Sequence, residues 1–183
     1  MPEMVEVVID SIRVGLMSQQ RVVILREVDA ERYLAIWIDP YMAEQITFAL
    51  QEVEVARPMT HDLMRDILRS VDARVVRVEV LSLKGDVFFG NIVVELNKET
   101  VNIDSRPSDA LALAVRTHVP ILISNEVMDA AGIVPEDDME ENGRAGEEGL
   151  GEEGEERLEV FEDFLDQLEF DEGDDGENAS KKN

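Results

Sequence analysis

The feature that most constrains this fold is a short strand that runs directly into an apolar helix, in the second half of the sequence. Residues 101–104 alternate between apolar and polar, which is the spacing of a β-strand. Pro107 suits the first turn of a helix, and either Ser105 or Arg106 can be the N-cap. Residues 110–115 are all apolar, so we expect this helix to be buried on nearly every side.

Charged side chains share one face of this predicted helix. Arg106, Asp109 and Arg116 recur at helical spacing. A buried helix that carries such charges needs partners for them. They could form an internal ion-pair network that locks the helix in place. Alternatively, the free N–H groups at the helix start and the neighbouring Arg106 could bind a phosphate.

The rest of residues 1–135 predicts one α+β domain with a mixed sheet. Each half of the domain is expected to run strand, strand, strand, helix, helix. Both halves place an Ile-Asp pair just before the first helix, at 38–39 and 103–104, which favours duplicated βββαα units. The predicted strands are residues 4–16, 21–28, 33–38, 74–83, 87–96 and 101–104, with a short extended segment at 120–123. The predicted helices are 40–52, 61–71, one from 107, and 125–131, the last with Gly132 as its C-cap.

The first two helices have separable faces. Asp39 and Thr60 are their expected N-caps. In the first helix the apolar face comprises Ala43, Ile46, Ala49, Leu50 and Val53. In the second helix, Leu63, Met64, Ile67, Leu68 and Val71 are expected to face the core. Its other face carries His61, Asp62, Arg65, Asp66 and Arg69, as a solvated surface with local ion pairs or as part of a site.

Three blocks of this sequence resemble the bifunctional nuclease family. They are residues 106–116 followed by Pro120-Ile121, residues 57–63, and residues 85–90, where the family usually has Ala at the position of Gly90. The resemblance covers roughly residues 4–134. It implies a duplicated fold and the hydrolysis of both DNA and RNA.

Phosphodiester hydrolysis needs an activated water and stabilisation of charge on the phosphate. The two longer blocks offer candidates for both tasks. The catalytic candidates are His61, Asp62 and Asp109, and the phosphate-binding candidates are Arg57, Arg106, Ser108 and Arg116. No metal motif of fixed ligand spacing occurs, so Mg²⁺ or Mn²⁺ is expected from the reaction class alone and its ligands are unknown.

Three positions bear on whether the chain is active. His61 could be a catalytic residue or a ligand, or it could be a capping or surface residue. His118, the other histidine, lies at the end of the apolar helix and is expected to be structural. The family usually has Glu at the position of Met42, and Met can neither bind a hard cation nor act as a base. This departure predicts a weak or inactive member if that carboxylate belongs to the site.

Charge limits the partners that this protein can have. The net charge is −25, of which residues 136–183 contribute −17 and residues 1–135 contribute −8. An acidic domain argues against a broad nucleic-acid-binding surface, although a local basic groove is still compatible with it. The chain has no cysteine, no apolar run of membrane-spanning length and no signal-peptide pattern. We therefore expect a cytoplasmic protein that forms no membrane contact.

The acidic tail has three predicted parts. Residues 136–157 are expected to be a disordered linker, 158–170 a short amphipathic helix, and 171–183 disordered. The helix could dock on the domain or bind a protein partner. The tail could compete with nucleic acid for a basic groove, or it could only keep the protein dispersed.

Two functions from different classes fit the sequence. The first is a nuclease that acts on DNA and RNA, and the second is a non-catalytic module that binds an anion or nucleotide or regulates a partner. A homo-oligomer is compatible with either function.

Overall fold

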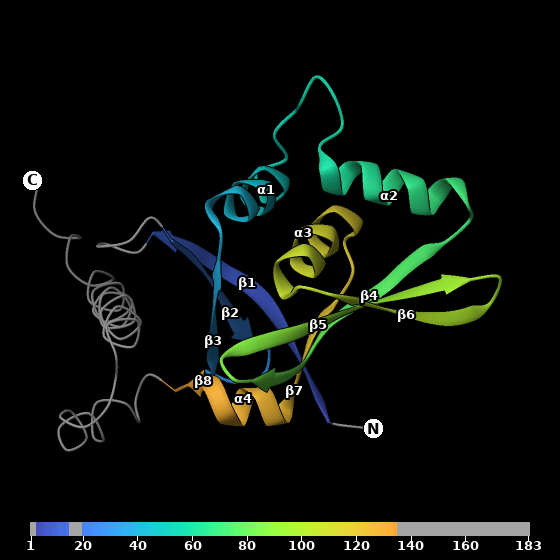
Figure 1. Cartoon of the computed structure of the whole chain (residues 1–183). Coiled ribbons are helices and arrows are strands. Elements are labelled where there is room, and N and C mark those ends of the chain that lie inside the picture. The colour runs from blue at the N-terminus through green and yellow to red at the C-terminus, as the bar shows by residue number, and fades with distance from the viewer. Residues whose placement is uncertain (1–2, 15–19, 135–183) are drawn as a thin grey trace, which may run out of the picture.

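One mixed sheet organises the protein in the computed structural model (Figure 1). The structure describes residues 3–14 and 20–134, and every count below refers to them. Eight strands follow the order β6-β5-β4-β7-β1-β2-β3-β8. Their bounds are β1 Met4–Val14, β2 Arg21–Glu27, β3 Tyr33–Ile38, β4 Arg74–Lys84, β5 Val87–Leu96, β6 Glu99–Ser105, β7 Ile121–Ser124 and β8 Gly132–Ile133.

The sheet consists of two antiparallel meanders joined by β7. Strands β1, β2 and β3 pair in sequence, and so do β4, β5 and β6. Strand β7 lies between them, antiparallel to β1 and parallel to β4. This single parallel contact makes the sheet mixed, so the predicted α+β fold with one mixed sheet is confirmed.

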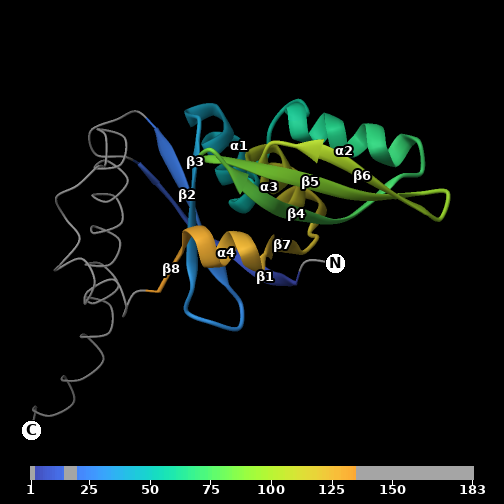
Figure 2. The same cartoon turned by 60° about the horizontal axis from the view of Figure 1, so that its bottom comes forward.

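Four helices pack on this sheet: α1 Pro40–Leu50, α2 Thr60–Ser70, α3 Pro107–Thr117 and α4 Asn125–Ala131. Helix α3 contacts α1, α2, β4 and β5, whereas α4 lies near the opposite end of the sheet against β3, β4 and β7 (Figures 1 and 2). Residues 110–114 of α3 are at most 1% exposed and belong to the main hydrophobic core. The predicted burial of the apolar helix is therefore confirmed, and α3 holds α1 and α2 in place.

Several predicted boundaries are correct, and others shift by one or two residues. Strands β3 and β5 and helix α4 have their predicted bounds. Strand β6 begins two residues earlier than predicted, because the turn Asn97–Lys98 has positive φ at both residues and closes a tight hairpin, and it ends one residue later than predicted. The prediction of five matching elements in each half does not hold in detail, since β7 separates α3 from α4 and β8 follows α4.

The prediction for α2 is partly wrong. Met59 is its N-cap, and Thr60 is already helical. Met64 and Leu68 pack against the core as expected. However, Leu63, Ile67 and Val71 are 53%, 53% and 54% exposed, whereas His61 is only 2% exposed. The helix is rotated so that His61 rather than Leu63 faces α3, and half of its apolar face remains uncovered.

In α1 the same kind of correction applies. Ala43 and Ile46 are buried as predicted, whereas Leu50 and Val53 are exposed and Met42 and Gln45 are buried instead.

Within residues 3–14 and 20–134, no helix has the length and apolar character required to span a membrane. The predictions for residues 136–157, 158–170 and 171–183 fall outside the described residues.

Candidate functional site

Helix α3 begins with an exposed arginine that is held by its own helix. Arg106 is the N-cap and Pro107 the first helical residue, which decides between the two N-caps that the sequence allowed. The Arg106 side chain, which is 63% exposed, caps no backbone N–H group of the helix. Instead, its Nε and Nη2 donate to the two carboxylate oxygens of Asp109, at 2.7 and 3.1 Å. This bidentate pair fixes a cation beside the first-turn N–H groups of α3, which lack intrahelical partners.

The first turn of α2 supplies a buried imidazole to the same carboxylate. His61 Nε2 lies 3.2 Å from Asp109 Oδ1. Burial lowers the pKa of His61, and the nearby Arg116 acts in the same direction against the hydrogen bond to Asp109. Neutral His61 then donates from Nε2, since an ionised carboxylate only accepts. Its buried Nδ1 has no partner among the residues that the structure describes.

Asp109 is ionised and central to this cluster. Its burial acts to raise its pKa, but the hydrogen bonds from Arg106 and His61 outweigh burial and lower it. The pairing raises the pKa of Arg106. The cluster therefore has a fixed carboxylate flanked by a permanent cation and a neutral imidazole.

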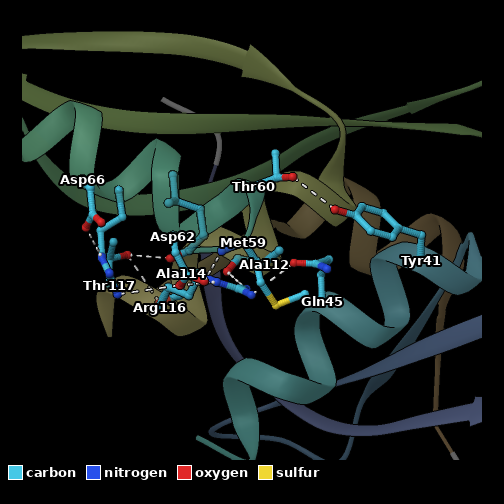
Figure 3. A network of polar contacts seen from close by, with 12 residues as sticks. Tyr41, Gln45, Met59, Thr60, Asp62, Asp66, Ala112, Ala114, Arg116 and Thr117 are labelled. Carbon is cyan, nitrogen blue, oxygen red and sulfur yellow. Dashed lines mark hydrogen bonds and ion pairs between the residues drawn. The ribbon is translucent and has the colours of Figure 1, made fainter. Parts of the chain in front are cut away.

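Two further contacts bring the start of α1 to the same place. Asp39 caps α1 by accepting from the Met42 N–H at 2.9 Å, and its other oxygen lies 3.7 Å from Arg106 Nη1. Tyr41, also in α1, places its hydroxyl 3.1 Å from Thr60 Oγ1 at the start of α2 (Figure 3).

Together these contacts link the N-terminal ends of α1, α2 and α3. We call this cluster the helix-start site, and it comprises Asp39, Tyr41, Thr60, His61, Arg106 and Asp109. Helix N-termini carry partial positive charge, so their convergence favours an anion.

A second polar network joins the same three helices (Figure 3). The Arg116 side chain is only 4% exposed, and its Nε donates to Asp62 Oδ1 at 3.0 Å. Its remaining donors bind the Ala112 carbonyl at 2.9 Å and Gln45 Oε1 at 3.3 Å. Asp62 also accepts from the Met59 N–H at 3.0 Å. Arg116 and Asp62 thus fasten α1 and α2 to α3.

The structure divides the predicted site residues into separate groups. His61, Arg106 and Asp109 meet, so the structure brings residues of the two longer sequence blocks together. Arg116 lies apart from this group: its side chain is enclosed, and each of its three nitrogens donates to a protein oxygen. Asp62 likewise is occupied by its structural partners.

The remaining two predicted residues differ in exposure. Ser108 is buried in the first turn of α3. Arg57 lies exposed in the α1–α2 connection, and no hydrogen bond or ion pair joins it to residues 3–14 or 20–134. Of these two, only Arg57 is exposed enough to reach a large ligand directly.

Sequence reasoning missed the role of Asp39 in the helix-start site and that of Gln45 in the second network. Asp39 was recognised only as a helix cap, although the Ile-Asp pair shared with residues 103–104 indicated that the two helix starts correspond. No local pattern could have indicated Gln45, since its partner Arg116 is 71 residues away in the sequence. The Nε2 of Gln45 is buried and has no partner within the described part of the chain.

The donor set does not fit a preformed site for Mg²⁺ or Mn²⁺. No cluster of three or more acidic, histidine or cysteine side chains that could hold a metal occurs in residues 3–14 and 20–134. Asp109 has both oxygens bound to Arg106 and His61, and Asp39 Oδ1 caps α1. Hard cations take oxygen ligands, so Asp109 would first have to release Arg106.

Two departures from the family pattern have clear structural settings. Met42 is 1% exposed and packs in the main hydrophobic core, so it takes no part in the polar site. Gly90 lies where β5 passes the junction of β6 and α3. A Cβ there would lie 2.9 Å from the Ser105 carbonyl oxygen and 3.0 Å from the Pro107 nitrogen. Gly90 therefore permits the close approach that sets the position of Arg106.

Sequence comparisons identify the family and several relatives of this chain. The family profile described as the bifunctional nuclease domain matches residues 23–136. An uncharacterized protein of Mycobacterium tuberculosis is 35% identical over 136 residues, which are 74% of this chain and 81% of that protein. Bifunctional nuclease 2 of Arabidopsis thaliana is 29% identical over 79 residues, or 42% of this chain and 24% of the relative. Bifunctional nuclease 1 of Oryza sativa subsp. japonica is 23% identical over 82 residues, or 43% and 25%.

Proposed function

Because this chain belongs to the bifunctional nuclease domain family, we propose that it hydrolyses phosphodiester bonds of DNA and RNA at the helix-start site. The observation that carries the proposal is the cluster of Arg106, Asp109 and His61. This cluster joins the sequence blocks 57–63 and 106–116, and it holds the Arg106 guanidinium where α1, α2 and α3 begin.

We assign phosphate binding to Arg106 and to the N-terminal ends of α1, α2 and α3. The exposed guanidinium keeps an Nη group beyond its bidentate contact with Asp109, and that group reaches a second carboxylate, Asp39, only at 3.7 Å. A phosphate can replace this long contact and accept from the first-turn N–H groups of α3. Donors arranged in this way stabilise the negative charge that develops on a phosphate during hydrolysis.

Asp109 and His61 are assigned to the attacking water. Asp109 is ionised and 27% exposed, so its carboxylate can orient a water beside the bound phosphate. His61 is enclosed and neutral, and it holds Asp109 through Nε2. We therefore treat His61 as a positioning residue. A divalent cation is expected from the reaction class and stays a prediction. The roles assigned to Arg106, Asp109 and His61 do not require it.

The runner-up function is a non-catalytic module that binds a nucleotide or another anion. One observation favours it: each candidate base is occupied or enclosed, since Asp109 is paired with Arg106 and the His61 Nδ1 is buried. The phosphate contacts would be the same in this function. Only a test of bond cleavage distinguishes it from the nuclease.

The test incubates the purified full chain with labelled single-stranded and double-stranded DNA and RNA. Parallel reactions contain Mg²⁺, Mn²⁺ or EDTA. A nuclease should cleave the substrates, and Arg106→Ala should lose most of that cleavage. Arg74→Ala is the matched control, because Arg74 is also an exposed arginine that pairs with a carboxylate, Glu95 at 3.7 Å.

The outcomes separate the two functions. Cleavage by the wild type that Arg106→Ala loses and Arg74→Ala keeps would support the nuclease. Binding of oligonucleotides without cleavage under all three conditions would support the binding module. Equal cleavage by the wild type and Arg106→Ala would contradict the assignment of the site.

A further inference from the structure

A hollow runs along α1 next to the helix-start site. It encloses about 470 Å³, a volume in the range of small-molecule sites. Its lining combines aromatic and aliphatic side chains with a few polar ones, namely Ile12, Arg21, Tyr41, Glu44, Thr47 and Phe48. This composition suits a flat, partly polar ring.

Tyr41 connects the hollow to the proposed phosphate site. Tyr41 lines the hollow, and the residue is 52% exposed. The hydroxyl bonds to Thr60, which holds the ring in one orientation (Figure 3). Asp39, only two residues earlier in the chain, contacts Arg106. A ligand that spans Arg106 and Tyr41 would therefore need a phosphate at one end and a ring at the other.

We propose that this hollow receives an unpaired nucleobase from the nucleotide whose phosphate binds at Arg106. This inference rests on the proposed function and adds its substrate class, namely single-stranded or locally unpaired DNA and RNA. Bases stack on aromatic side chains with little dependence on sequence, because every base has a π-face. The bases of a duplex are stacked and paired, and one can enter such a hollow only after it has left the helix.

A second hollow of about 470 Å³ does not serve this purpose. It is lined by Val8, Leu50, Val115, His118 and Pro120, among others. These residues lie at the C-terminal end of α3, about 16 Å from the helix start if the helix is regular. A helix C-terminus repels anions, so this hollow has no phosphate site beside it.

The test measures binding rather than cleavage, with the full chain in EDTA. One probe is a labelled single-stranded oligothymidine, and the other is an abasic strand with the same number of phosphates. Tyr41→Ala should weaken binding of the oligothymidine about 10-fold and leave the abasic strand unchanged. Tyr41→Phe keeps the ring, so its affinity should stay within about twofold of the wild type.

Two further variants make the result interpretable. Val28→Ala shortens an exposed apolar side chain in the β2–β3 connection, away from the three helix starts, and should change neither affinity. Arg106→Ala removes the phosphate contact and should weaken both probes. Equal effects of Tyr41→Ala on both probes, or no effect on either, would overturn the nucleobase site. Unchanged affinity of Arg106→Ala for both probes would overturn the proposed function instead.

Discussion

At the scale of single residues, the site depends on how His61 and Arg116 are placed. Both are polar residues buried among three helices, and each has a carboxylate partner. Of the two interpretations that the sequence left open, the ion-pair network applies to Arg116, which binds Asp62 rather than Asp109. The exposed Arg106 is the one positioned for an anion.

The buried His61 makes stability depend on pH. Burial lowers its pKa from the usual 6.5, so the folded state binds a proton less readily than the unfolded state. The stabilisation from neutral His61 is complete above the pKa that this residue has in the unfolded chain. It is lost as the pH falls from that value towards the lower pKa of His61 in the folded protein. We expect the Tm to fall between about pH 7 and pH 5. Asp109, whose pKa is lowered from 3.8, contributes only at a more acidic pH.

Thermal melts of two histidine variants check this prediction. His61→Gln keeps a hydrogen-bond donor for Asp109 but cannot titrate, so its Tm should fall less over this pH range. His118→Gln changes an exposed histidine and should show the same fall as the wild type. The prediction is wrong if the curves of His61→Gln and the wild type have equal slopes.

At the scale of elements, the junction of β5, β6 and α3 positions the site. The alternation of residues 101–104 and the proline at 107 were sufficient to predict a strand that runs into a helix. The sequence could not indicate how α2 is rotated. Its apolar face is wider than the surface that α3 offers, so periodicity alone could not select the half that contacts the core.

Gly90→Ala tests this junction. The added methyl group would meet the Ser105 carbonyl oxygen at 2.9 Å, and backbone atoms must shift to accept it. We expect a loss of about 1–3 kcal/mol in the free energy of unfolding, as for other overpacked sites. Because Arg106 moves with the junction, oligonucleotide affinity should also fall. Urea denaturation and fluorescence anisotropy measure the two effects.

Gly85→Ala is the control for this substitution. Gly85 has a φ of +52° and nothing within 4 Å of an added Cβ, so alanine there is strained without a collision. It should reduce stability and leave oligonucleotide affinity unchanged. Gly90→Ala with the stability and affinity of the wild type would show that the junction has room to adjust.

At the scale of the whole molecule, one edge of the sheet is open. Strand β6 has no neighbour beyond β5 among residues 3–14 and 20–134. The tight turn Asn97–Lys98 makes Leu96 and Glu99 a hydrogen-bonded pair, so the N–H groups of residues 100, 102 and 104 point outward. Exposed edges of this kind pair with other chains.

We predict that two copies of the chain associate through β6. Antiparallel pairing centred on Asn102 places Glu99 opposite Ser105 and Asp104 opposite Thr100, so no like charges face each other. The net charge of −25 opposes association, which should therefore strengthen as salt is added. Light scattering coupled to size exclusion measures the mass against a monomer of 20.6 kDa.

Thr100→Pro should abolish this association, because proline removes an outward N–H group and leaves the bonds to β5 intact. Thr100→Val keeps that N–H group and should associate like the wild type. A monomeric wild type at every salt concentration would contradict the prediction. So would a dimer that Thr100→Pro does not weaken.

The most direct test of the helix-start site is an NMR titration of the full chain with a single-stranded oligonucleotide in EDTA. If phosphate binds where α1, α2 and α3 begin, the largest shifts should occur at amides of their first turns, including Met42, His61 and Asp109. The amides of α4 and β8, near the other end of the sheet, should not move. Shifts concentrated away from the three helix starts, with Met42, His61 and Asp109 unmoved, would contradict the proposed site.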